Sequence, residues 1–122
     1  MPDMQHLLEE YIAQASVHSS TELSSKASVR VANAAADRLR SIALEIGTLG
    51  PESVAMFGEL LNSSSPRLRT WVAHHLLELM RPGPRLTSTA LAAIEQAAAS
   101  DGPDAAGERL WLKNWQREHP PT

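Results

Sequence analysis

The chain has 122 residues, of which 43% are hydrophobic and 20% are charged, and it contains no cysteine. This length is typical of one domain, and the apolar content is too high for a disordered chain. The absence of cysteine excludes disulfides, iron–sulfur clusters, zinc–thiolate sites and thiol nucleophiles. The net charge of −3 makes the chain a poor general binder of nucleic acid, because affinity for phosphates depends on the cations presented.

The N-terminal sequence is acidic and amphipathic, and it lacks the basic and apolar regions of a signal peptide. No stretch approaches the roughly 18 uninterrupted apolar residues of a membrane-spanning helix. We therefore expect a cytoplasmic protein that does not contact a membrane. Nine arginines against two lysines, with abundant alanine, are typical of a GC-rich bacterial genome.

Residues 1–50 predict a pair of helices at the start of the chain. In the first helix, apolar residues recur at the i, i+3, i+4, i+7 spacing, and Asp3 is placed to cap it. The serine-rich segment 16–28 predicts the first connection. Within it, Ser19 and Glu22 have the spacing of a capping box, so we expect a long second helix from about residue 20. Its core stripe is predicted to comprise Val31, Ala35, Leu39, Ile42 and Ile46.

The remaining sequence predicts four shorter helices in two pairs. The first pair covers about 51–61 and 66–80, with Ser65 as cap and Pro66 in the first turn of the second helix. The segment 81–87 is rich in proline and glycine and predicts a loop, after which Thr87 caps a helix over about 88–99. The last helix is predicted to run from about residue 103 to Glu118. No segment alternates β-branched residues as a strand would, so the expected fold class is all-α with about six helices.

The two pairs also suggest an internal repeat. A shift of 37 residues places Pro66 on Pro103 and Phe57 on Ile94. A period near 40 residues with two helices per unit falls in the range of HEAT and armadillo repeats. Such units stack because one unit alone does not bury its apolar face.

The segment ELLNSSSPRLRTWVAHHLL resembles a HEAT repeat, in which a leucine, a polar turn and a proline precede an arginine and core-facing alanine and leucine residues. The matching residues here are Leu61, Pro66, Leu68, Arg69, Ala73 and Leu76. The whole chain also resembles a small bacterial family of HEAT-like domains of unknown function. In that family a helical pair precedes one repeat, and a tryptophan near the end is similar to those in LWLKNW, Leu110–Trp115.

The resemblance implies one domain over 1–122, built as a short α-α superhelix. Residues 1–50 would form an N-terminal helical cap, 51–80 a HEAT-like unit and 87–118 a second, degenerate unit. Arg69 would be a structural hydrogen-bonding residue, and the second helix of each unit would line the inner surface, where partners bind. The wheel position of Arg69 agrees, because it falls within the apolar arc and needs a partner for its charge there.

The pair His74 and His75 does not predict a metal site. Adjacent helical residues point about 100° apart, whereas metal-binding helices place their ligands at i, i+4. Glu78 is one turn away, and local pairing with the histidines accounts for it. We expect no metal and no cofactor.

The sequence does not predict an enzyme either. It has no recognisable nucleophile motif, phosphate-binding loop or dinucleotide-binding motif, and its serines cluster where caps and turns use them. We therefore expect no catalytic residues.

The predicted functional feature is an outer face on the helix 66–80. Tryptophan, histidine and arginine together are typical of interaction hot spots. Trp71 is either an exposed anchor of this face or is covered by the segment 81–86. Trp111 and Trp115 are predicted to pack with Leu110 on the core side of the last helix. The candidate partner-binding residues are Arg67, Trp71, His74, His75, Glu78, Arg81 and Arg85.

Three functional hypotheses follow from this face. We expect a non-enzymatic protein-interaction domain whose partner is another protein. The first alternative is an immunity protein that neutralises a bacterial toxin. The second, less favoured, is a nucleic-acid binder that uses Arg67, Arg81 and Arg85. The acidic N-terminal helix could also meet these arginines in another copy, which would give a homo-oligomer.

Overall fold

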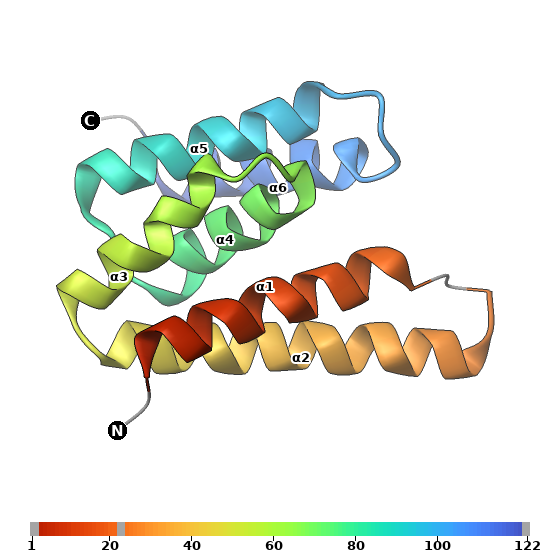
Figure 1. Cartoon of the computed structure of the whole chain (residues 1–122). Coiled ribbons are helices and arrows are strands. Elements are labelled where there is room, and N and C mark those ends of the chain that lie inside the picture. Colours follow the sequence, from red (N-terminus) through yellow and green to blue (C-terminus); the bar gives the residue numbers. More distant parts are fainter. Residues whose placement is uncertain (1–2, 22–23, 121–122) are drawn as a thin grey trace.

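The chain is all-α in a computed structural model, which describes residues 3–21 and 24–120 (Figure 1). Within those residues there are six α-helices and no strand, so the predicted fold class is confirmed. The helices are α1 (Met4–Ser20), α2 (Lys26–Thr48), α3 (Pro51–Gly58), α4 (Pro66–Leu79), α5 (Gly83–Ala99) and α6 (Ala105–Glu118), and a short 3-10 helix, η1, covers Glu59–Asn62. None of the helices in the described ranges combines the length and the apolar character that crossing a membrane needs.

The first helix starts as predicted but ends later. The Asp3 carboxylate accepts a hydrogen bond of 3.0 Å from the backbone N–H of Gln5, which confirms the predicted cap. The predicted start of the second helix near residue 20 is wrong, because α1 continues to that point. Ser19 lies inside α1 and donates its hydroxyl to the carbonyl of Ala15, so it does not cap a following helix. Ser25 caps α2 instead, and Glu22, the other half of the expected capping box, lies outside the described residues.

The middle of the chain follows the prediction closely. Ser65 caps α4 by accepting from the backbone N–H of Leu68 at 3.3 Å, and Pro66 occupies the first turn. The preceding predicted helix, 51–61, is divided, because α3 ends at Gly58 and the chain tightens into η1. Gly58 also permits a close approach to α5, since a Cβ atom there would lie 2.8 Å from the side chain of Leu86.

The helix predicted from about residue 88 begins five residues earlier, at Gly83. Thr87 therefore lies within α5 and is not its cap. The sequence around this start is compatible with a helix, because proline fits the first turn, where its missing N–H is not needed. Gly83 adopts a positive φ of 84°, which a glycine accepts without strain, and Pro84 follows it in the first turn. The last helix, α6, begins at Ala105, two residues later than predicted.

The core lies between the α1–α2 hairpin and helices α3, α4 and α5. In Figure 1 the hairpin lies on one side of α4, and α5 and α6 lie on the other. The fully buried large side chains are Tyr11, Leu39, Ile42, Ile46, Phe57, Val72, Leu76 and Ile94. One member of the predicted α2 stripe is wrong: Val31 is 50% exposed, and the neighbouring Ala32 is buried in its place.

Candidate interaction surface on α4

The outer face of α4 carries four residues at i, i+4, i+7 and i+11, an arrangement that places them in a row on a helix. They are Arg67, Trp71, His74 and Glu78. Together with Arg81 and Arg85, which follow at the start of α5, we call these residues the α4 surface. Side chains of α1 and α6 border it on two sides.

Trp71 is partly buried, so it is neither a freely exposed anchor nor a core residue. Its ring lies edge-to-face on the imidazole of His18, with the ring centres 5.1 Å apart, and tilted against His75 at 5.6 Å. The last turn of α1 therefore covers part of Trp71. The segment 81–86, the other predicted cover of Trp71, comprises the end of the α4–α5 connection and the first turn of α5.

His75 does not belong to the outer face, and its prediction as an exposed contact residue is wrong. The residue is 7% exposed, and its Nδ1 atom shares a hydrogen bond of 2.7 Å with the hydroxyl of Tyr11 on α1. Tyr11 in turn packs edge-to-face on Phe57 at 4.9 Å. His75 thus faces α1, one helical step of about 100° away from His74.

Burial controls the charge of this pair. It lowers the pKa of His75 to about 4 and raises the pKa of Tyr11 above its usual range. Both groups are therefore neutral at neutral pH, and their hydrogen bond satisfies two polar side chains inside the core. Because the pair is closed off from solvent, it is structural.

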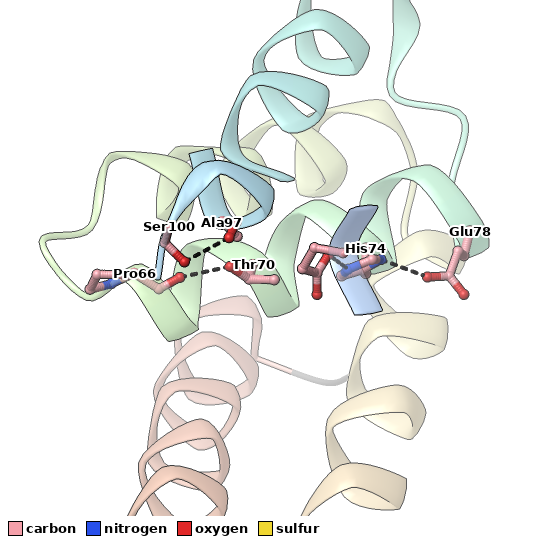
Figure 2. Close-up of polar contacts among 7 residues, drawn as sticks. Pro66, Thr70, His74, Glu78, Ala97 and Ser100 are labelled. Carbon is pink, nitrogen blue, oxygen red and sulfur yellow. Dashed lines mark hydrogen bonds and ion pairs between the residues drawn. The ribbon is translucent and has the colours of Figure 1, made fainter. Parts of the chain in front are cut away.

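His74 lies at the junction of α4 and α6. Its Nδ1 is 3.1 Å from a carboxylate oxygen of Glu78, one turn along α4, and its Nε2 is 2.7 Å from a carboxylate oxygen of Glu108 on α6. Figure 2 shows the side chains of His74 and Glu78 directed at one another. The indole of Trp111 also packs edge-to-face on the His74 ring, with centres 4.7 Å apart.

This geometry favours the charged form of His74. A carboxylate only accepts hydrogen bonds, so both ring nitrogens must carry a proton to satisfy both partners, and a neutral imidazole has a single N–H. Burial opposes the charge, but the hydrogen bond that His74 donates to Glu78 and the charge of Glu108 outweigh it and raise the pKa of His74. The hydrogen bond to His74 correspondingly lowers the pKa of Glu78.

The ends of the α4 surface differ in how their charges are paired. Arg67 forms an ion pair with Asp104, just before α6, at 3.4 Å; the two side chains are 46% and 70% exposed. Arg81 and Arg85 are exposed and form no ion pair with any described residue. The free positive charge of the surface therefore gathers near the start of α5.

Beside these arginines the surface is hollowed. An open cavity of about 510 Å³ lies where the α2–α3 connection faces the α4–α5 connection. Its apolar walls include Val54, Met80 and Leu86, and Glu78 and Arg81 lie at its lining. Gly47 is close to this wall, since a Cβ atom there would lie 3.5 Å from Met80.

The predicted structural residues occupy two places. Arg69 is partly buried and donates a hydrogen bond of 2.7 Å from Nη1 to the carbonyl of Ser63, which ties α4 to the loop before Pro66. Trp111 packs partly against the core, and Trp115 stacks in parallel on it at 5.4 Å. Leu110, which we expected on the same face, is 60% exposed, so the packed face of α6 is rotated away from it.

Sequence reasoning missed the three residues that border the surface from other helices: His18, Asp104 and Glu108. Each is brought to α4 by tertiary packing across at least 34 residues of chain.

Among the described residues, no group of three or more potential ligands could hold a metal ion. The chain matches no protein-family model, and no curated protein and no solved structure is significantly similar to it.

Proposed function

We propose that this chain is a non-enzymatic protein-interaction domain that binds another protein through the α4 surface. The observation that carries the proposal is an open hollow with apolar walls that is lined also by the exposed charges of Glu78 and Arg81, with exposed Arg85 next to the lining residue Leu86 in sequence. An apolar centre within a polar rim is the usual anatomy of a protein–protein interface. The partner would place an apolar side chain in the hollow and acidic groups near the two arginines.

The histidines support binding rather than catalysis. His75 is closed off in the core, and both ring nitrogens of His74 are held by carboxylates. A general base needs a free nitrogen within reach of the proton that it removes. His74 has none, and His75 is buried with its Nδ1 bonded to Tyr11.

The arginines favour a protein over a nucleic acid. Arg67 is paired with Asp104, which leaves Arg81 and Arg85 as the free cations of this surface in the described part of the chain. Two cations give little counterion release, whereas non-specific binding to DNA depends on many.

A HEAT-like arrangement is part of the proposal. Consecutive helices α3 and α4, and then α5 and α6, would form two stacked units behind the α1–α2 pair. Close packing of α4 on α5 and of α5 on α6 supports this arrangement. The α4 surface would then lie on the inner side of the stack.

The proposal is tested by capturing the partner from the native host with the full chain, and then measuring binding with both proteins purified. Arg81→Glu places a like charge opposite the acidic groups of the partner, and we expect it to weaken binding about tenfold or more. Arg30→Glu, the same change on the exposed face of α2, is the matched control and leaves the affinity unchanged. Equal affinities for the wild type and Arg81→Glu would exclude this surface.

A further inference from the structure

The last helix is attached to the molecule differently from the others. Helices α4 and α6 both have 14 residues, but α4 buries five of them and α6 buries Ala105 alone. Trp111 and Leu112 add partial contacts with the core, whereas Leu110 is 60% exposed. Since burial of apolar surface supplies most of the free energy that holds a helix in place, we expect α6 to be held less strongly than α4.

Side chains of α6 and of Asp104, the residue just before it, cover part of the α4 surface. Going along the chain, Asp104 pairs with Arg67, Glu108 with His74, and Trp111 packs on the His74 ring. These three residues follow the i, i+4, i+7 spacing and so lie on one face. The backbone of α6 packs along α5, and its reach to α4 is made by these side chains.

The connection before α6 permits its release. Residues 100–104 contain Gly102 and Pro103 and lie outside both helices. The polar link of α6 to α5 is one hydrogen bond of 2.9 Å from Arg109 to the carbonyl of Ala98, at the end of α5. Withdrawal of α6 would remove the partial contacts of Trp111 and Leu112 with the core, but none of the fully buried large side chains, which all belong to other helices.

We propose that α6 is a displaceable cover of the α4 surface, and that the partner docks there with a helix of the same chemistry. That helix would carry two acidic residues one turn apart and an aromatic residue at i+7, the spacing of Asp104, just before α6, and of Glu108 and Trp111 within it. This inference rests on the proposed function, and it adds the kind of partner and a means of control. A tethered helix competes at a local concentration in the millimolar range, so the cover lowers the affinity for a helix added in solution.

The test uses the full chain and a labelled synthetic peptide of residues 103–119, with binding measured by fluorescence anisotropy. The cover is weakened by Glu108→Gln with Trp111→Ala, which leaves the α4 surface intact. We expect this chain to bind the peptide about tenfold or more tightly than the wild type does, because a lost charged hydrogen bond and a lost ring contact each favour release. Glu118→Gln, a matched change at the exposed end of α6, should bind the peptide as weakly as the wild type.

Two further measurements keep the result interpretable. The same peptide with Glu108→Gln and Trp111→Ala should lose its binding to the weakened chain, because its contacts to His74 are gone. Hydrogen exchange on the wild type should show amides of α6 at least about tenfold less protected than those of α4. Equal protection of α6 and α4 would overturn the proposal.

Equal peptide binding by the wild type and the weakened chain would also overturn it. Exchange of α6 between two wild-type copies, seen as crosslinks between them, would assign the surface to a second copy and would overturn docking of a different protein. These results are separate from the proposed function, which is decided by Arg81→Glu with the purified partner.

Discussion

Helix α4 meets its neighbours through two adjacent histidines, and the two contacts differ in almost every physical respect. On the α1 side, His75 is buried, neutral and bonded to Tyr11. On the α6 side, the His74 side chain is 17% exposed, lies between two carboxylates and favours its charged form. One contact belongs to the apolar core, and the other depends on charge.

This difference explains how α4 can stay packed on α1 while its contact with α6 opens more readily. Contacts within the core are strengthened by the apolar area removed from water around them. The α4–α6 contact removes less apolar area from water, because α6 buries Ala105 alone, and its ion pair joins side chains of His74 and Glu108 that are 17% and 14% exposed. We therefore expect the α1–α4 contact to open only when the whole molecule unfolds, and the α4–α6 contact to open more readily.

Removing the aromatic ring of Tyr11, at the contact between α1 and α4, should have the largest effect on stability. Tyr11→Ala leaves a cavity beside Phe57 and an unsatisfied nitrogen on His75, so we expect a loss of about 3–5 kcal/mol in the free energy of unfolding. Urea denaturation followed by circular dichroism measures it. Tyr11→Phe keeps the ring and removes the hydroxyl, and should cost only about 1–2 kcal/mol. Equal losses for the two variants would mean that packing of the ring contributes little.

Acidification should destabilise the protein through the same contact, between α1 and α4. In the unfolded chain His75 has an ordinary pKa near 6.5, whereas in the folded chain burial lowers the pKa to about 4. Between these values the unfolded state binds more protons, so stability falls as the pH falls from about 6.5 to about 4. A difference of this size corresponds to about 3 kcal/mol at most.

The double variant Tyr11→Phe with His75→Leu isolates this contribution, because it replaces both partners by apolar groups of similar shape. Its stability should fall less steeply over the same pH range in parallel urea titrations. Identical slopes for the variant and the wild type would show that His75 does not carry the acid sensitivity.

On the α6 side the pH dependence should have the opposite sign. The pKa of His74 is raised in the folded chain, so its contribution to stability is fully present below its unfolded pKa and is lost as the pH rises through the folded value. We expect a smaller effect than that of acid, confined to α6 and seen as faster hydrogen exchange there after correction for intrinsic rates. His74→Gln removes the titration and serves as the control. Slower exchange in α6 of the wild type at higher pH would contradict the assignment.

The sequence was sufficient to predict features set by local chemistry. The caps of Asp3 and Ser65 and the burial of Leu39 and Ile42 follow from short-range spacing, and the structure confirms them. The predicted start of α5 is too late, because a segment rich in proline and glycine predicts a loop although proline also fits a first helical turn.

The candidate site was harder to predict, because its environment comes from distant parts of the chain. Which of the two histidines is buried depends on Tyr11, 64 residues before His75. One local signal was present: Leu68, Val72 and His75 follow the i, i+4, i+7 spacing, which places His75 with the buried residues of α4. No comparable signal connected His74 to Glu108, since that contact depends on where the last helix packs.

The smallest effect on stability should come from removing the ion pair between Arg67 and Asp104. Measuring it tests which contact holds α6 in place. Both side chains are largely open to solvent, so water screens their attraction and little apolar area is buried around them. Arg67→Ala should therefore change the free energy of unfolding by less than about 0.5 kcal/mol. Urea denaturation beside the Tyr11 variants measures this change.

Hydrogen exchange in α6 should also stay close to that of the wild type in Arg67→Ala, whereas Glu108→Gln should accelerate it. That pattern would show that α6 is held in place mainly at His74, where two carboxylates and an indole contact one ring. If Arg67→Ala lowers the free energy of unfolding by about 1 kcal/mol or more, the ion pair with Asp104 also holds the start of α6 in place. The α4–α6 contact would then depend on two charged anchors, one at each end of the covered face.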